Sequence, residues 1–281
     1  DGILKGLSAE VFYAYDISGA YRSGFQQTYA TSELLPTGLY ATYGTANKVD
    51  YLPNSFSGNV RKSEFWAGFD YDRTFGNHDI KFSARTSRQI YATFGNLDIR
   101  REGLSGRLTY GFKQRYFMDL TAGYSGSENF AVGRRFGFFP AVSVGWIVSD
   151  EDFMKGSASF LDLLKIRGSY GLVGNDAIGS ARRFAFNDFF ARSTTGYTFG
   201  TGYNGVGGSG QLALANPYLT WEKARKSSIG FDAKMFKQSV AISADYFHEN
   251  RKDLATSSLL PNILGQTLIF VNEGEASYKG F

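Results

Sequence analysis

The sequence contains no cysteine and only two histidines in 281 residues. The absence of cysteine excludes a small secreted fold held together by disulfides, and it excludes structural zinc sites built on thiolates. His78 and His248 lie far apart in the sequence, so a metal pair or a general-base histidine has little support. No nucleophile elbow for Ser-His-Asp catalysis occurs either. We therefore predict a protein that is not an enzyme and has no catalytic residues, no metal and no bound cofactor.

Long hydrophobic runs are also missing. The longest uncharged, mostly apolar stretch covers residues 136–149, which is shorter than the roughly 18 residues a membrane-spanning helix needs. The first residues lack the charged and apolar regions of a secretory signal peptide. If this chain lies in a membrane, it must cross as a closed β-barrel, because lipid cannot satisfy open backbone groups.

Strong charge of one sign is a third absence, since the net charge is only +4. Three arginine pairs occur, at 100–101, 134–135 and 182–183, but they are dispersed among acidic residues. No basic run of five or more is present, so we predict no nucleic-acid partner.

Two short motifs point to ligands only weakly. The segment 200–205 matches G-x-G-x-x-G, but a dinucleotide site needs a strand before it and a helix after it. Further glycines follow, so we interpret it as part of a flexible loop. The Asp150-Glu151-Asp152 cluster lacks the spacing of a calcium loop. We interpret it as the start of a capped helical turn at Ser149.

Aromatic residues and glycine are abundant, with 26 Phe, 18 Tyr and 34 Gly, as in all-β proteins with many turns. Apolar and polar residues alternate with a period of two, which indicates β-strands with one apolar face. Nine segments show this alternation, at about 7–17, 64–72, 80–86, 104–113, 116–125, 138–148, 164–172, 229–235 and 240–246. A tenth strand is expected near the C-terminus.

Three features favour a membrane barrel over a soluble sandwich. Most segments approach the roughly 9–11 residues of a tilted transmembrane strand. Tyr and Phe gather near the segment ends, as in the aromatic girdles of barrels. Short connections, such as 76–78, 113–115 and 237–238, alternate with long ones at about 18–62, 88–103, 126–135 and 173–221. The connection at 149–162 is long for a turn. Outer-membrane barrels have short periplasmic turns and long extracellular loops.

Several blocks between Gly103 and Phe281 resemble the barrel of SusC/RagA-like, TonB-dependent outer-membrane transporters. Each block is short, but they follow one another in the family's order. The blocks are Arg107-Leu108-Thr109-Tyr110, Arg115-Tyr116-Phe117, Gly123-Tyr124-Ser125-Gly126-Ser127, Arg135 to Trp146, Leu164 to Gly171, Gly174-Asn175-Asp176, Asn216 to Lys223, Asp245-Tyr246-Phe247 and Asn272-Glu273-Gly274.

The resemblance implies a plugged barrel of about 22 strands in a Gram-negative outer membrane. Such receptors import glycan oligomers or peptides with a SusD-like surface lipoprotein, and TonB supplies the energy. We expect residues 1–281 to be part of a single all-β barrel domain, contributing nine or ten strands. The plug and the terminal strands are expected to lie outside this segment, as are the parts that engage TonB.

Seven residues are candidates for solute contact. Asp70, Asp72, Arg107 and Arg167 lie on the polar side of their segments, so they would face the lumen, where they contact solute or plug or simply hydrate the wall. Tyr197, Phe199 and Tyr203 lie in the loop expected at 196–210. Their rings could stack on sugars or grip peptides, or pack against the lipoprotein.

Two other functions fit the sequence. A transporter-like barrel could serve as a structural subunit of a larger outer-membrane complex. A soluble, secreted β-protein that binds carbohydrate would show similar alternation, with the apolar residues in a core.

Overall fold

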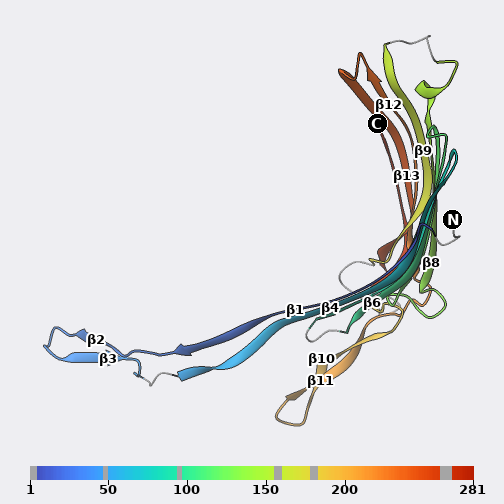
Figure 1. Ribbon diagram of the computed structural model, residues 1–281. Coiled ribbons are helices and arrows are strands. Elements are labelled where there is room, and N and C mark those ends of the chain that lie inside the picture. Colours follow the sequence, from blue (N-terminus) through green and yellow to red (C-terminus); the bar gives the residue numbers. More distant parts are fainter. Residues whose placement is uncertain (1–4, 47–49, 94–96, 155–159, 178–182, 260–267) are drawn as a thin grey trace. The chain divides into compact units, whose positions relative to one another are not determined.

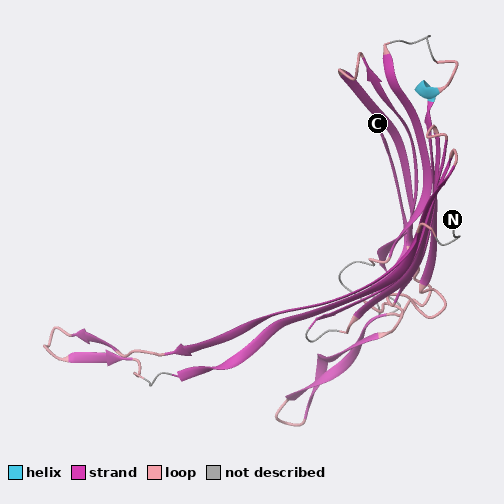
Figure 2. Ribbon diagram, in the orientation of Figure 1, coloured by secondary structure: helices cyan, strands magenta, loops and turns pink. Residues whose placement is uncertain are grey.

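The computed structural model describes residues 5–46, 50–93, 97–154, 160–177, 183–259 and 268–281. The structure is all-β, and ten strands form one antiparallel sheet in the order β1-β4-β5-β6-β7-β8-β9-β12-β13-β14 (Figures 1 and 2). No helix in the described part of the chain is long and apolar enough to cross a membrane. The strands of the sheet are β1 (Leu7–Gln26), β4 (Asp50–Phe75), β5 (His78–Thr93), β6 (Ile99–Phe112), β7 (Tyr116–Ser127), β8 (Phe136–Ile147), β9 (Leu161–Asn175), β12 (Glu222–Met235), β13 (Val240–Leu259) and β14 (Leu268–Gly280).

Two separate hairpins interrupt the long connections. One pairs β2 (Thr31–Leu34) with β3 (Tyr40–Tyr43), and the other pairs β10 (Phe189–Phe199) with β11 (Asn204–Ala213). By contacts the chain divides into two compact units, 1–12 with 65–88 and 100–281, and 13–64 with 89–99. Strands β1, β4, β5 and β6 contribute residues to both units. The expectation of a single barrel domain over 1–281 stays a prediction.

All nine expected segments are strands of the large sheet, and the tenth is β14. The strands are longer than expected, however. Strand β1 continues to Gln26 and β4 begins at Asp50, so that together with β2 and β3 most of the loop expected at 18–62 is strand. The loop expected at 88–103 is likewise mostly strand, because β5 ends at Thr93 and β6 begins at Ile99. The apolar residues of these extensions, such as Tyr21, Phe25 and Tyr91, are interrupted by glycine and polar residues on the same side of the strand, so regular alternation of hydrophobicity does not mark them.

Two further expectations are wrong. The segment 196–210 is not a flexible loop but most of the β10–β11 hairpin, and the G-x-G-x-x-G motif forms its turn. Gly200 has φ 75° and Tyr203 φ 49° there, and a strand follows instead of a helix. After β8, a 3₁₀ turn covers Val148–Asp150 and has no side-chain cap, so Ser149 does not cap a helix.

The short connections are tight turns with left-handed backbone. Lys113 and Gln114 have φ 51° and 54°, and Arg115 N–H donates to the Phe112 carbonyl at 3.0 Å. Left-handed central residues match the twist of the flanking antiparallel strands. Residues 236–238 repeat this conformation between β12 and β13.

The register gives the sheet one apolar and one polar face. Side chains directly opposite each other on neighbouring antiparallel strands lie on the same face, so Leu104↔Tyr124↔Phe138 and Arg107↔Thr121↔Ala141 belong to opposite faces. The apolar face consists of Leu104, Leu108, Tyr110, Phe112, Tyr116, Met118, Leu120, Tyr124, Phe136, Phe138, Val142, Val144, Trp146, Ile166, Tyr170, Ile229, Phe231, Ile242 and Tyr246.

The apolar face is exposed, and its aromatic residues gather at both ends. Leu104 is 57% exposed, Phe138 58% and Ile229 61%. The second sheet of a soluble sandwich would bury these residues. Stacked rings mark each end of the face: Tyr124 on Phe136 at the end with long connections, and Phe112, Tyr116 and Trp146 at the end with short turns.

Candidate functional site

The polar face carries a network of ion pairs across neighbouring strands. Arg107 on β6 pairs with Asp119 on β7 in a two-pronged geometry, with Nε–Oδ1 at 3.0 Å and Nη2–Oδ2 at 3.1 Å. Thr109 also donates to Asp119. The guanidinium fork matches both carboxylate oxygens, which fixes the orientation of the pair.

Arg167 joins three strands on the same face. Its guanidinium donates from β9 to Asp232 on β12 at 3.0 Å and to Asp245 on β13 at 2.6 Å. Ser243 completes this brace through a hydrogen bond of 2.6 Å to Asp232. All four side chains remain partly exposed, so the polar face is ordered by ion pairs and still accessible to water.

The other two acidic candidates have partners on β5. Asp70 pairs with Arg85 at 3.4 Å, and Asp72 pairs with Lys81 at 2.6 Å. All four polar candidates from the sequence therefore lie on this face and in ion pairs. The candidates are not gathered at one point, because the pairs are spread along the face from β4 to β13.

A shallow pocket of about 280 Å³ lies between the two ion-pair groups. Its lining includes Asp119, Lys165, Arg167 and the hydroxyls of Ser169 and Ser228, which lie 2.8 Å apart. The Lys165 ammonium sits 5.6 Å from the centre of the Phe117 ring. Charged forks, hydroxyls and an aromatic ring can together bind polar solutes that carry apolar patches. In the part of the chain that the structure describes, no group of side chains is arranged to hold a metal ion.

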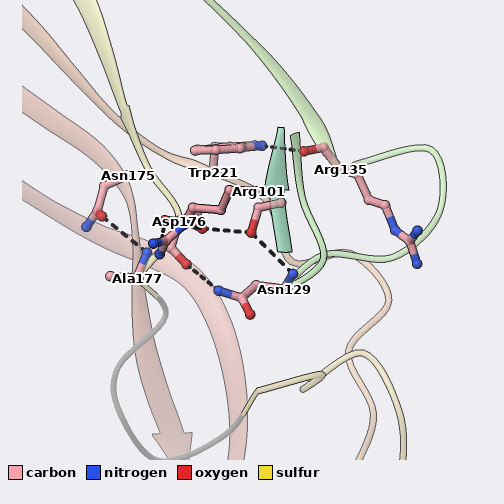
Figure 3. A network of polar contacts seen from close by, with 8 residues as sticks. Arg101, Asn129, Arg135, Asn175, Asp176, Ala177 and Trp221 are labelled. Carbon is pink, nitrogen blue, oxygen red and sulfur yellow. Dashed lines mark hydrogen bonds and ion pairs between the residues drawn. The ribbon is translucent and has the colours of Figure 1, made fainter. Parts of the chain in front are cut away.

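A second polar cluster lies at the end of the sheet with the long connections (Figure 3). The half-exposed Arg101 makes a two-pronged pair with the carboxylate of Asp176, at 2.8 and 3.0 Å. Asp176 is buried and also accepts a hydrogen bond of 2.7 Å from Ser127. Asn129 donates to the Asp176 carbonyl at 3.0 Å. This network joins the ends of β6, β7 and β9.

A small apolar core lies beside that network. Phe130, Ala185, Leu219 and Trp221 are buried against one another, and Leu219 is 0% exposed. The Trp221 indole donates to the Arg135 carbonyl at 3.0 Å. The segment before β12 is therefore packed onto the β7–β8 connection.

Two asparagines fix the same segment to β14. Asn272 accepts from Thr220 N–H at 2.9 Å, and its amide donates to the carbonyls of Thr220 at 2.9 Å and Asp253 at 2.7 Å. Asn216 donates to the Phe270 carbonyl at 2.6 Å and accepts from Tyr218 N–H at 3.0 Å. We call these contacts, with the Phe130–Leu219–Trp221 core, the loop anchor.

The loop anchor was not recognised as a site from the sequence. Its residues Asn216 and Asn272 were seen only as parts of the resembling blocks. An asparagine that follows a strand and precedes a proline is a common turn residue. Its position in the sequence does not identify the distant carbonyl to which its side chain will donate. The resemblance itself was the only available signal.

The loop anchor holds the base of the β10–β11 hairpin, which carries the three aromatic candidates. Tyr197 and Phe199 lie on one face of β10 with ring centres 5.4 Å apart, and Tyr197 is paired with Val206. Tyr203 lies in the turn. All three are largely exposed, Tyr197 at 72% and Tyr203 at 79%. Val206 and Asn204 lie opposite Tyr197 and Phe199 on β11, and both rings stay exposed beside them.

A further polar cluster lies at the short-turn end of the sheet. Glu151, just after the 3₁₀ turn, accepts hydrogen bonds from the Tyr116 hydroxyl at 2.5 Å and the Trp146 indole at 2.9 Å. These hydrogen bonds, that of Tyr116 above all, hold the pKa of Glu151 below its usual range. The middle residue of the acidic cluster therefore orients two stacked aromatic rings.

Comparison with known proteins agrees with this geometry. Residues 5–281 match the family described as TonB dependent receptor-like, beta-barrel. The TonB-dependent receptor P39 of Formosa agariphila is 33% identical over 212 residues, which are 75% of this chain and 19% of that protein. The TonB-dependent receptor SusC of Bacteroides thetaiotaomicron is 27% identical over 221 residues, 77% of this chain and 20% of that protein. The chain thus spans about a fifth of the length of these relatives.

A solved structure of the RagAB peptide transporter has the same fold. The superposition includes 98% of this chain and 32% of the matched transporter chain, with a TM-score of 0.71 and 18% sequence identity. The SusC/RagA-like resemblance and the partial barrel fold are therefore confirmed. The chain belongs to the TonB-dependent receptor β-barrel family.

Proposed function

We propose that this chain forms part of the wall of a TonB-dependent transporter that imports nutrients across a Gram-negative outer membrane. The two-faced sheet is the observation that carries the proposal. An exposed apolar face bounded by aromatic rings at both ends suits contact with lipid. An opposite face built from ion pairs and hydroxyls suits a water-filled lumen.

The same proposal assigns the two ends of the sheet. The tight turns at 113–115 and 236–239 would lie in the periplasm, and the long connections with the loop anchor would lie outside the cell. A SusD-like surface lipoprotein would deliver the solute there, and TonB would act through parts of the receptor beyond these residues. The lipid contacts would be those of the apolar face.

Within this function, the solute would pass the aromatic hairpin and then the polar face. Tyr197, Phe199 and Tyr203 offer exposed rings for the apolar faces of sugars or peptide side chains. Asp70, Asp72, Arg107 and Arg167 would line the path in pairs. Because each is already neutralised, we expect them to bind neutral or zwitterionic solutes better than strongly charged ones. Glycan oligomers are the first substrate class we propose, and peptides the second.

Uptake by whole cells tests the proposal. A strain that lacks the full-length receptor should lose import of its fluorescently labelled oligosaccharide or peptide, and the intact gene should restore import only when TonB is present. Unchanged uptake in the deletion strain, with loss of another envelope complex, would support the structural role instead.

The hairpin has a matched control. The double change Tyr197→Ala and Phe199→Ala should raise the solute concentration needed for half-maximal uptake at an unchanged surface level of receptor. Tyr29→Ala, at a residue of similar exposure (73%) outside the hairpin, should leave it unchanged. Equal effects of the two variants would exclude the hairpin as a solute contact.

A further inference from the structure

A pocket of about 200 Å³ lies between β9, β12 and β13, toward the end of the sheet with the long connections. Within its lining, Lys226 on β12 lies opposite Glu249 on β13 and Gly171 on β9. The same row of the register leads through Ala141 to Arg107. The pocket therefore belongs to the polar face, and we call it the β12 pocket.

Two cations in the β12 pocket share one carboxylate. Arg251 Nε donates to Glu249 Oε1 at 2.5 Å, and Lys226 Nζ lies 3.2 Å from Glu249 Oε2. The Glu249 side chain is 14% exposed, whereas those of Lys226 and Arg251 are 50% and 45% exposed. Among the ion pairs of the described residues, no other carboxylate on the polar face serves two cations.

This sharing leaves hydrogen-bond donors of both cations unused. Arg251 is bound to Glu249 through Nε, so the donors on Nη1 and Nη2 remain, and the Lys226 ammonium has further protons. Neither side chain has another hydrogen-bond acceptor in the part of the chain that the structure describes. Because both cations converge on Glu249, they can donate together to a second carboxylate beside it.

Apolar side chains lie next to the two cations. Val173, which is 49% exposed, and Ala224 are in one row of the register with Arg251. A β-bulge at Asp253, which has φ 59°, shifts the register so that Leu254 lies on the same face as Arg251. Bulges of this kind change the direction of a side chain. The bulge thus gives the β12 pocket an apolar wall.

Glu222 limits the negative charge that the pocket accepts. It also lines the pocket, and its carboxylate accepts hydrogen bonds from the Asn175 amide at 2.7 Å and from Ala255 N–H at 2.9 Å, both neutral donors. The remaining cation of the lining, Lys223, is paired with Asp253 at 3.0 Å. A ligand with several negative charges would be repelled by Glu222. The lining therefore fits one carboxylate on an otherwise uncharged body.

We propose that the β12 pocket binds a single carboxylate group of the imported solute, with Lys226 and Arg251 as the donors. The free C-terminus of a peptide and the carboxyl group of one uronic acid in a glycan share this chemistry. The neighbouring part of the solute would lie against Val173 and Leu254. The inference rests on the proposed function only in taking the polar face as the path of the solute, and it deepens that function by naming one group the solute carries.

Isothermal titration calorimetry on the purified full-length receptor tests the pocket with two pairs of probes. One pair is N-acetylated penta-alanine with a free C-terminal carboxylate and the same peptide as its C-terminal amide. The other pair is cellobiouronic acid, which has one carboxylate, and neutral cellobiose. We expect the carboxylate to tighten binding about tenfold in at least one pair, because charge-assisted hydrogen bonds are the stronger ones. The pair that shows this preference identifies the source of the carboxylate.

Two variants should change the preference in opposite directions. K226Q/R251Q removes the charged donors, so the preference within a pair should fall below about twofold. E249Q removes the resident carboxylate and keeps both cations, so the carboxylate probe should bind about fivefold more tightly than in the wild type. Residues that only held the strands together would give no such gain.

The matched control is K252Q. Lys252 is on the same strand as Arg251, is also 45% exposed and also forms an ion pair, with Glu275 at 3.2 Å, but it does not line the β12 pocket. This change should leave the carboxylate preference as it is in the wild type. Resistance of the barrel to SDS without heating checks that every variant is folded.

Equal affinity within both pairs, or no binding of any of the four probes, would overturn the proposal. An equal loss in K252Q and K226Q/R251Q, or weaker binding of the carboxylate probe to E249Q, would overturn it too. Whole-cell uptake of the same probes, with and without TonB, separates this inference from the proposed function. TonB-dependent uptake that does not distinguish the members of a pair refutes the pocket alone. A carboxylate preference in the titrations without TonB-dependent uptake refutes the transport alone.

Discussion

Replacing Asn272 with alanine should release the β10–β11 hairpin from the sheet without unfolding the barrel. The side chain makes three hydrogen bonds, two with the backbone of Thr220 and one with the Asp253 carbonyl. Thr220 precedes Trp221 and follows the buried Leu219, so these bonds fix the segment that packs the apolar core of the loop anchor.

The expected cost is several kilocalories per mole of local stability. A hydrogen bond between neutral groups contributes about 0.5–1.5 kcal/mol net, and an unsatisfied buried partner costs about 1–3 kcal/mol. The Thr220 and Asp253 backbone groups are only partly buried, so water recovers part of the loss. We expect about 2–4 kcal/mol for the three bonds together, which corresponds to roughly 30- to 800-fold in the equilibrium for opening the anchor.

Hydrogen exchange with mass spectrometry on the full-length receptor measures this directly. In Asn272→Ala, amides of β10 and β11 and of residues 216–221 should exchange faster by that factor, because their protection depends on local opening. Amides in the middle of β7, β8 and β9 should keep their wild-type protection.

The conservative control is Asn272→Asp, which keeps the acceptor for Thr220 N–H but loses both donated bonds and places a charge against two carbonyls. It should open the anchor at least as far as alanine does. If alanine leaves hairpin exchange unchanged, or if the whole sheet loses protection together, the loop anchor is not an independent local unit and the reasoning is refuted.

Three further changes test other parts of the structure. Leu219→Ala leaves a cavity at a fully buried position and should lower the stability of the loop anchor by about 2–5 kcal/mol. Trypsin should then cleave the 183–221 connection at a lower urea concentration than in the wild type. Cleavage at the wild-type urea concentration would contradict this packing. Asp119→Asn removes the ion pair with Arg107, whose partners are 58% and 30% exposed. The free energy of unfolding of the barrel, measured by thermal denaturation, should therefore fall by less than about 1 kcal/mol. A larger loss would show that the pair is structurally essential. The Glu151 cluster should weaken in acid: the pKa of Glu151 is lowered from 4.5, so its stabilising hydrogen bonds are present above that value and are lost as the pH falls through the lowered pKa. Tryptophan fluorescence should change in that range for the wild type and not for Glu151→Gln, and identical titrations would contradict the assignment.

The sheet was predictable because one of its faces is apolar and the other polar, so that residue class alternates along each strand. Leu104, Gly106, Leu108 and Tyr110 alternate with Ser105, Arg107 and Thr109, and every such segment proved to be a strand. The extensions of β1 and β4 were missed because residues such as Ser18, Gly19 and Arg22 interrupt the apolar period there.

Polar positions were predicted better than their partners. Arg107 and Arg167 were correctly placed on the polar face, because the period of two fixes the side of each residue. Their partners Asp119, Asp232 and Asp245 depend on the register between strands, which for β9 and β12 joins residues 65 positions apart. The loop anchor depends on such distant contacts throughout, so no local pattern identified it.

The bonds of Asn272 also have a consequence for the order of assembly. Thr220 and its partner are 52 residues apart, and Asn272 reaches its position only once the last strand of the sheet has aligned beside β13. The segment before β12 is also held by Trp221, whose indole donates to the Arg135 carbonyl, but Asn216 and Asn272 can add their bonds only once β14 is paired. The loop anchor is therefore complete only after β14 has aligned, and protection of this segment during biogenesis would report that step.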